Sequence, residues 1–186
     1  KRINAVAGRG YRLAKDFHDA VMKDLWTKDP VARETLDEAL DVLVVGGGMS
    51  GIMTAGRLVR HGVTDLRLIE RGGDFGGTWY WNRYPGAACD TESYIYMPLL
   101  DETGYIPSRK YAGQPELQAY LKQLAGQFEV TPRTLFNTKA DSFVWDEASQ
   151  RWIVRTDEGD TFRARFIALC AGSLSQPKLP AIEGIE

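Results

Sequence analysis

The first 40 residues show the alternation of hydrophobic and polar positions that is typical of amphipathic helices. Between Tyr11 and Trp26, apolar residues recur at helical spacing and charged residues occupy the opposite face. Pro30 interrupts this pattern, and a second short helical pattern covers residues 31–40. Because the polar face carries both signs of charge, packing against protein is favoured over binding to a membrane surface. We therefore expect residues 1–40 to form a helical arm docked onto a main domain.

The pattern changes at residue 41 to that of a βαβ unit. The β-branched run DVLVV, residues 41–45, predicts a buried strand and leads directly into the glycine-rich turn GGGMSG. The next segment, IMTAGRLVRHG, predicts a helix that ends at Gly62, and residues 65–70 predict a second strand. Consecutive strands joined by a helix require a parallel sheet and a right-handed crossover.

The second half of the chain predicts one helix followed by a β-meander. Pro115 starts a helical pattern that continues to Phe128. Short strands are expected at 142–145, 152–156 and 161–164, with turns between them. The acidic residues around the last of these turns are interpreted as solvated charges: Asp157, Glu158 and Asp160. The final run RFIALCAG predicts a buried strand that closes the unit.

Length and composition suit one domain with an appendage. The chain has 186 residues, of which 44% are hydrophobic and 26% charged, enough to bury a substantial core. A net charge of -2 gives no basic field for nucleic acid, and no apolar run approaches the roughly 20 residues that span a bilayer. The predicted fold class is α/β. A Rossmann-like domain with a parallel sheet, helices and an antiparallel β-meander fills residues 41–186, preceded by the α-helical arm of residues 1–40.

Neither the cysteines nor the histidines indicate a metal or redox site. Cys89 and Cys170 lie 81 residues apart, without CxxC or metal-ligand spacing and without a secretory leader, which favours free thiols in a reducing, cytoplasmic setting. The same separation excludes the redox pair of disulfide reductases. His18 and His61 are lone histidines on predicted helices, so we assign them no ligand or acid-base role.

The glycine-rich turn has the spacing of a dinucleotide-binding fingerprint. Gly46 permits the tight turn, Gly48 lets the backbone approach a pyrophosphate, and Gly51 allows close packing of helix on strand. Glu70 follows 70 − 51 = 19 residues later at a strand end, where its carboxylate can accept from ribose hydroxyls. A carboxylate there repels a 2′-phosphate, which favours FAD or NAD over NADP, although Arg71 weakens this argument. A turn that serves packing alone is the alternative.

The run GGTWYWNRYPGAACD, from Gly76 to Asp90, carries four aromatic residues beside glycines and a proline. Paired glycines let the backbone pass close to a flat ligand. The aromatic residues can wall an aromatic ring and exclude water. The same features suit a loop that merely plugs the core, and from the residues alone this second interpretation is the favoured one.

This run resembles the FAD-domain signature of Baeyer-Villiger monooxygenases nearly residue for residue. The matching positions are Gly76, Gly77, Thr78, Trp79, Tyr80, Trp81, Asn82, Arg83, Tyr84, Pro85, Gly86, Cys89 and Asp90. The similarity covers residues 41–186 and includes CAGSLSQPKLP, which looks like the family's linker with Ala171 and Gly172 retained. The first 40 residues are expected to lie outside it, as an extension that some members carry.

The resemblance implies a site for FAD and an approach for NADP. It places Ser50 and Glu70 at the pyrophosphate and adenosine ribose, Thr78–Trp81 along the flavin, and the backbone of Ala140 near the adenine. Asp90 and Tyr96 would lie near the isoalloxazine, where the nicotinamide approaches along Ala88, Cys89 and Asp90. The expected cofactor-binding residues are Gly46, Gly48, Ser50, Gly51, Glu70, Gly77, Thr78, Trp79, Tyr80, Trp81, Ala88, Cys89, Asp90, Tyr96 and Ala140.

Asp90 is the one catalytic residue that the resemblance implies. In the family, the matching aspartate orients an arginine that stabilises negative charge on the oxygenated flavin. From the residues alone, Asp90 is equally suited to be a helix N-cap before Thr91-Glu92-Ser93. Both roles can hold at once.

The implied activity is Baeyer-Villiger oxidation, in which FAD and NADPH insert one oxygen atom of O2 beside a ketone carbonyl to give an ester or lactone. The 186 residues contain neither the family's FxGxxxHxxxW fingerprint nor a second glycine-rich fold for NADP. We therefore expect the catalytic unit to need the remainder of the same polypeptide, and this chain alone to be inactive. The alternatives are a flavin monooxygenase that oxidises nitrogen or sulfur and a non-catalytic flavin-binding module.

Overall fold

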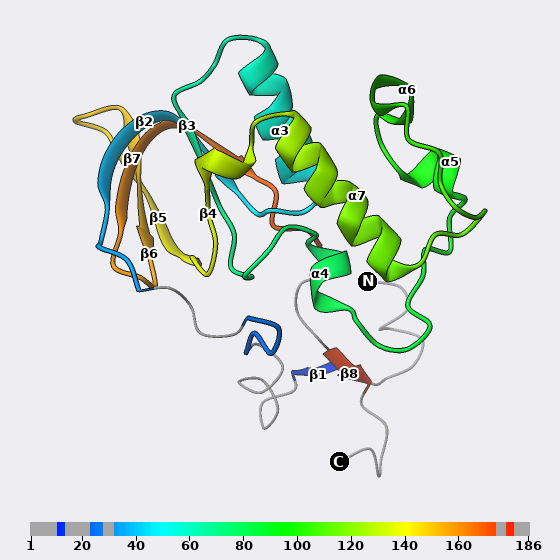
Figure 1. Cartoon of the computed structure of the whole chain (residues 1–186). Helices are drawn as coiled ribbons and strands as arrows, with labels where there is room; N and C mark the ends of the chain where they lie inside the picture. Colours follow the sequence, from blue (N-terminus) through cyan, green and yellow to red (C-terminus); the bar gives the residue numbers. More distant parts are fainter. Residues whose placement is uncertain (1–10, 14–22, 28–31, 174–177, 181–186) are drawn as a thin grey trace.

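The computed structural model describes residues 11–13, 23–27, 32–173 and 178–180. Its main feature is a six-stranded mixed sheet with the strand order β4-β3-β2-β7-β6-β5. Two longer helices, α3 and α7, lie next to one another on one side of this sheet (Figure 1). A separate two-stranded ribbon, β1-β8, brings residues near the two ends of the chain together. The predicted α/β class with a parallel sheet, helices and a meander is confirmed.

The predicted βαβ unit forms the centre of the sheet. Strand β2 (Asp37–Val45) is followed by helix α3 (Met49–Arg60) and strand β3 (Leu66–Ile69), which pairs with β2 in parallel. The short strand β4 (Thr134–Leu135) adds to the outer edge of β3. Gly62, just past α3, has φ +83°, as expected for a residue that ends a helix.

The helical prediction for residues 31–40 is wrong over its described part. Residues 32–36 form no helix, and β2 already begins at Asp37, which pairs with Thr161 of β7. Leu40 is buried in this pairing. Local periodicity favoured a helix, but pairing with a strand more than 100 residues away determines the conformation here. The division of the chain at residue 41 stays a prediction.

The helix predicted to start at Tyr11 is also wrong at its beginning. Tyr11–Leu13 form strand β1, which pairs antiparallel with β8 (Lys178–Pro180). Because the partner strand lies over 160 residues away, the spacing of apolar residues within the arm could not reveal this pairing. Most of the remaining predicted helix, residues 14–22, lies outside the described residues.

The meander continues the sheet beyond β7. The meander consists of β5 (Ala140–Asp146), β6 (Arg151–Thr156) and β7 (Thr161–Leu169). Each strand pairs antiparallel with the next along the chain. Strand β7 is a single long strand, because it also pairs in parallel with β2 along nearly its whole length. The two strands expected at 161–164 and 165–172 are therefore one.

The second half of β7 is less buried than predicted. Phe166 and Leu169 are 60% and 68% exposed. Strand β6 pairs with β7 only between Thr161 and Ala164, so the later part of β7 has β2 as its only partner among the described strands. Ile167 and Ala168 still pack against the two hydrophobic clusters, so the apolar run is only partly buried, and Phe166 and Leu169 are its exposed members.

Several short helices join β3 to the long helix α7. They are α4 (Thr78–Trp81), α5 (Ser93–Tyr96) and α6 (Leu100–Thr103). Helix α7 (Gln114–Gln127) begins with Pro115 in its first turn, as predicted, and is followed by the 3-10 turn η1 (Thr131–Arg133). Figure 1 shows α5 and α6 beside α7, on the side that faces away from the sheet.

Two hydrophobic clusters hold the domain together. The larger lies between the helices and one face of the central strands and includes Val44, Leu68 and Leu124. The smaller includes Leu43 and Ile69, which point to the opposite face, and packs them against Phe162 of the meander. The central strands are therefore covered by helices on one side and by the meander on the other.

Asp160 is a buried anchor rather than the solvated turn charge that the sequence suggested. Its side chain is fully buried and accepts from both terminal nitrogens of Arg33, at 2.7 and 2.6 Å. The Leu36 amide and the Thr156 hydroxyl also donate to it, at 2.9 and 2.8 Å. Arg33 lowers the pKa of Asp160 to about 2. Asp157 and Glu158 are exposed, as predicted.

Candidate functional site

A cleft of about 720 Å³ lies at the carboxyl ends of β2, β3 and β7. Its lining comes from the segments 45–50, 69–71, 76–82, 138–143 and 169–173, together with Tyr96. Open α/β sheets bind ligands at this position, outside the carboxyl ends of their parallel strands. The cleft is therefore the candidate site.

Two of the fingerprint glycines, Gly46 and Gly48, line the cleft, and Gly46 and Gly51 leave no room for a side chain. Gly46 has φ +111°, and a Cβ there would lie 2.5 Å from the carbonyl oxygen of Cys170. A Cβ on Gly51 would lie 1.8 Å from the carbonyl oxygen of Gly46. Gly48 is the N-cap of α3, and no described side chain caps that helix end. The first amides of α3 thus remain available to an anion at the cleft.

A second glycine pair packs against the first. The amide of Gly76 donates to the carbonyl of Gly47 at 3.1 Å. Gly77 has φ +54°, and a Cβ there would lie 2.8 Å from the Cα of Gly48. The two loops therefore meet backbone to backbone, which gives a flat ligand close access to main-chain amides and carbonyls.

Glu70 joins both loops and lines the cleft. Its side chain is buried, and its two carboxylate oxygens accept from the Gly47 amide at 2.5 Å and from the Gly72 amide at 2.6 Å. Burial raises the pKa of Glu70, although these two hydrogen bonds oppose the shift. Each carboxylate oxygen can accept a further hydrogen bond, so the group retains acceptor capacity toward the cleft.

Tryptophans from the run 76–90 form the aromatic wall. Trp79 and Trp81 both line the cleft, and the guanidinium of Arg71 lies 4.4 Å from the ring centre of Trp81. The indole nitrogen of Trp79 donates to the Tyr96 hydroxyl at 2.8 Å, and their rings meet edge to face. This bond fixes Trp79 and brings Tyr96 to the cleft from α5.

Five of the expected cofactor-binding residues do not line the cleft, and Gly51 and Tyr80 are two of them. Gly51 is in the first turn of α3, where it is buried against the Gly46 carbonyl. The side chain of Tyr80 is buried on the other side of its loop, where its hydroxyl donates to Asp24 at 2.6 Å. A direct contact of the Tyr80 side chain with a ligand in the cleft is therefore not supported. The other expected residues that line the cleft are Gly46, Gly48, Ser50, Glu70, Gly77, Thr78, Trp79, Trp81, Tyr96 and Ala140.

Ala88, Cys89 and Asp90 lie outside the cleft. Ala88 forms an isolated bridge with Gly113, and Cys89 is buried in the larger cluster. Asp90 is exposed, and the N-cap of α5 is Glu92, so the N-cap role considered for Asp90 is not found. Burial raises the pKa of Tyr96, and the nearby Cys89 and Asp90 raise it further. The charge of Asp90 thus acts on a residue of the cleft wall.

Several residues that line the cleft were not expected from the sequence. Asn82 belongs to the aromatic run, and Lys139 adjoins Ala140. Their positions beside expected residues were the signal in the sequence that could have identified them. Ser173 follows the apolar end of β7. Lys139 and Arg71 add positive charge to an opening whose acidic residue is Glu70.

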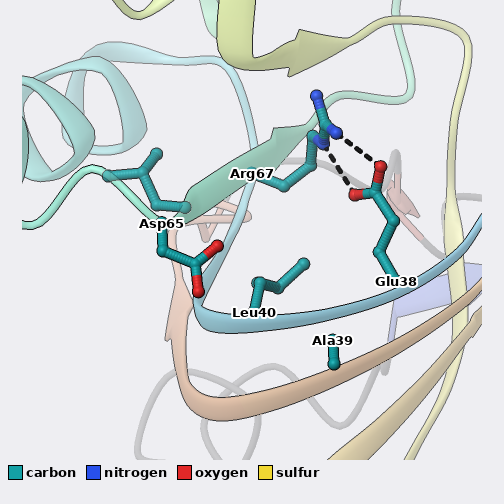
Figure 2. Close-up of a pocket in the computed structure, with 6 residues that line it drawn as sticks. Glu38, Ala39, Leu40, Asp65 and Arg67 are labelled. Carbon is teal, nitrogen blue, oxygen red and sulfur yellow. Dashed lines mark hydrogen bonds and ion pairs between the residues drawn. The ribbon is translucent and has the colours of Figure 1, made fainter.

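A second pocket of about 350 Å³ lies toward the opposite ends of β2 and β3. Figure 2 shows its main polar contact, in which the guanidinium of Arg67 pairs with both carboxylate oxygens of Glu38 at 3.0 and 2.5 Å. On its far side, Asp65 accepts from the Asp41 amide at 3.1 Å. These side chains satisfy one another, so the pocket is a junction between strands and is separate from the candidate site.

Metal and disulfide chemistry find no support among the residues that the structure describes. Cys89 and Cys170 are both free thiols, as predicted. The described part of the chain holds no group of three side chains placed to bind a metal ion. None of the described helices is long and apolar enough to cross a membrane.

The fold and the cleft define a Rossmann-like nucleotide-binding domain. Residues 44–124 match the family model described as an NAD(P)-binding Rossmann-like domain. A Baeyer-Villiger monooxygenase of Streptomyces coelicolor is 47% identical over 186 residues, covering all of this chain and 31% of its own length. The whole chain aligns, so the expectation that residues 1–40 lie outside the similarity is wrong for this relative.

Solved structures agree with the sequence comparison. The polycyclic ketone monooxygenase from Thermothelomyces thermophila is 33% identical with a TM-score of 0.81, over 98% of this chain and 32% of that one. A structure of OTEMO in complex with FAD and NADP is 36% identical with a TM-score of 0.72, over 78% of this chain and 28% of that one. The chain is similar over its whole length to Baeyer-Villiger monooxygenases and spans about a third of the length of the curated relatives it matches.

Proposed function

We propose that the cleft binds FAD and that this chain is the FAD-binding part of a Baeyer-Villiger monooxygenase. The observation that carries the proposal is the meeting of two glycine loops, an uncapped helix N-terminus and the buried Glu70 at one cleft. A dinucleotide presents a pyrophosphate, a ribose and a flat ring, and the cleft offers a matching group for each. The relatedness to Baeyer-Villiger monooxygenases selects FAD among the dinucleotides.

Each part of FAD has residues suited to hold it. The amides at the start of α3, including Ser50, would bind the pyrophosphate, and Glu70 would accept from the adenosine ribose. Thr78, Trp79 and Trp81 would line the flavin and exclude water from it. The adenine end would lie along Ala140 on the meander side. FAD supplies the redox chemistry, and these residues bind and orient it.

The proposed overall reaction uses NADPH as the hydride donor and O2 as the oxidant. One oxygen atom is inserted beside a ketone carbonyl to give an ester or lactone, and the other leaves as water. The Baeyer-Villiger relatives support this assignment. The NADP-binding part and the ketone pocket would come from the remainder of the polypeptide. The two free thiols of this chain, Cys89 and Cys170, fit a cytoplasmic protein.

Asp90 is proposed to serve the reaction from beside the cleft. It is exposed next to Tyr96, so its carboxylate is free to orient a cationic side chain that is contributed by another part of the protein. A fixed charge of this kind would stabilise negative charge that develops on bound oxygen. Ala88 and Cys89 would shape the path of the nicotinamide.

An absorption measurement distinguishes the enzyme from a non-catalytic flavin module. The protein carrying this chain is saturated with FAD, and NADPH and a ketone are then added under air. An enzyme bleaches the flavin band, regains it in air and forms ester, whereas a module stays yellow throughout. Asp90→Ala should retain bound FAD and lose most ester formation, and unchanged ester yield would remove Asp90 from the mechanism.

A further inference from the structure

Asp24, in the described segment 23–27, is attached to the loop that carries the aromatic run. One of its carboxylate oxygens, Oδ2, accepts from the Tyr80 hydroxyl at 2.6 Å and from the Gly73 amide at 3.0 Å. The Thr27 hydroxyl donates to the same oxygen at 2.7 Å. The carboxylate thus connects its own segment to two points of the loop that leads into the cleft wall.

The other oxygen of Asp24 shapes its own segment. Oδ1 accepts from the amides of Trp26 and Thr27, at 2.8 and 3.2 Å. Burial opposes ionisation of Asp24, but the hydrogen bonds from Tyr80, Thr27 and the backbone outweigh it and hold its pKa below the ordinary value. The group is therefore a carboxylate at neutral pH, with both oxygens engaged.

Segment 23–27 also packs closely on the loop. A Cβ on Gly73 would lie 1.9 Å from the Thr27 hydroxyl oxygen, so only glycine fits there. Arg83, just after α4, lies over both the Trp26 ring and the Tyr80 ring, at 4.8 and 4.6 Å from their centres. Its Nε donates to the Tyr80 carbonyl at 2.9 Å. Tyr80 is thus held at its hydroxyl by Asp24 and at its carbonyl by Arg83.

Tyr80 lies between the two tryptophans that line the cleft. In the single turn of α4, successive side chains point about 100° apart, so the direction of Tyr80 determines those of its neighbours. Tyr80 is 2% exposed, and its ring meets the Trp81 ring edge to face at 5.1 Å. Holding Tyr80 away from the cleft therefore turns Trp79 and Trp81 toward it.

We propose that Asp24 is a positioning residue for FAD: by binding Tyr80 and Gly73 it fixes the orientation of the tryptophan wall. The inference rests on the proposed FAD site and assigns segment 23–27 a part in it. Asp24 itself does not touch the cleft, so its effect passes through Tyr80. Without this attachment the aromatic loop would have several conformations, and the binding of FAD would have to select one of them.

The test compares Asp24→Ala with Glu34→Gln in the protein carrying this chain. Glu34 is an exposed acidic residue of the same N-terminal region, which makes its neutral variant a matched control. Asp24→Ala should raise the Kd for FAD about tenfold or more, because charge-assisted hydrogen bonds are lost. It should also change the visible circular dichroism of bound flavin. Glu34→Gln should leave both the Kd and the flavin dichroism unchanged. Asp24→Asn, which keeps one acceptor oxygen, should have a Kd between those of wild type and Asp24→Ala.

A double variant tests whether Asp24 affects FAD binding through Tyr80. If Asp24 acts through Tyr80, the double variant Asp24→Ala/Tyr80→Phe should bind FAD no more weakly than the weaker single variant. Additive losses would overturn the inference, as would an Asp24→Ala variant with the wild-type Kd and flavin dichroism. Tyr80→Phe and Asp24→Asn provide the same test if Asp24→Ala does not fold.

A measurement without FAD separates this inference from the proposed function. Amide hydrogen exchange at Gly73 and along α4 should be faster in Asp24→Ala than in wild type or Glu34→Gln. A wild-type protein that fails to bind FAD would refute the proposed function. Unchanged exchange in Asp24→Ala would refute the attachment of the loop, whatever the outcome with FAD.

Discussion

Single side chains determine the shape of the cleft by binding backbone amides. Glu70 accepts from the Gly47 and Gly72 amides, so one carboxylate joins the fingerprint turn to the loop after β3. Asp24 does the same for Gly73 one residue later. Side chains pack directly against these glycines, since a Cβ on Gly72 would lie 2.7 Å from the Tyr80 ring and one on Gly73 1.9 Å from the Thr27 hydroxyl oxygen. The carboxylates satisfy the amides of this tightly packed backbone.

Asp160 allows a test of buried electrostatics at the scale of one residue. Its pKa of about 2 lies below the ordinary value of 3.8, so the native state favours its ionised form. Its contribution to stability is complete above about pH 4 and is lost as the pH falls through about 2. Urea unfolding of wild type should show this loss, and Asp160→Asn should lack it.

Removing the Asp160 charge should also lower stability at neutral pH. Asp160→Asn leaves Arg33 without its ion pair and should reduce the free energy of unfolding by roughly 3 kcal/mol. Glu158→Gln, an exposed neighbour, should change it by less than about 0.5 kcal/mol. Equal effects of the two variants would show that Asp160 behaves as an ordinary surface charge.

The sequence predicts residues of the site best where local geometry decides. Gly46 and Gly48 follow from fingerprint spacing, and Glu70 from its place at a strand end. The direction of Tyr80 was not predictable, because it depends on Asp24, which lies 56 residues earlier. The burial of Asp160 depends in the same way on Arg33, which lies 127 residues from it.

At the scale of elements, the turn that joins strand β2 to helix α3 is closely packed against the start of the helix. Gly51 →Ala would place a methyl group 1.8 Å from the Gly46 carbonyl oxygen, a backbone atom that cannot move without displacing the turn. We expect this variant to lose about 3 kcal/mol of unfolding free energy, measured by urea denaturation. The cleft should lose its ligand affinity at the same time.

Gly126→Ala is the matched control for that substitution. Gly126 lies in α7, and nothing lies within 4 Å of a Cβ placed there. Alanine is a better helix former, so this variant should gain about 0.5–1 kcal/mol. A Gly51→Ala protein as stable as wild type would show that helix and turn do not need their close contact.

The elements that local pattern predicted are those whose partners are close in sequence. Helix α3, helix α7 and the strands of the meander belong to this class. The start of β2 and strand β1 belong to the other, because they form by pairing with β7 and β8 far along the chain. An amphipathic pattern fits a helix or an edge of a sheet, and only the distant partner decides between them.

At the scale of the whole molecule, the candidate cleft lies at the carboxyl ends of the parallel strands, beside the exposed apolar side chains Phe166 and Leu169 of β7. Leu169, one of the exposed residues of β7, also lines the cleft. The chain spans about a third of the curated relatives it matches. The proposed binding of FAD is therefore the property that can be tested most directly on this chain.

The measurement that tests the central claim most directly is the Kd for FAD of wild type and Gly48→Ala. Gly48 has φ -81°, which any residue adopts, and a Cβ there would lie 3.4 Å from Gly77 in ordinary contact. The variant should fold with wild-type stability but place a methyl group where the pyrophosphate approaches, and raise the Kd about tenfold or more. Gly126→Ala should bind FAD like wild type. Equal affinity of Gly48→Ala and wild type, or no binding of FAD by wild type, would contradict the account.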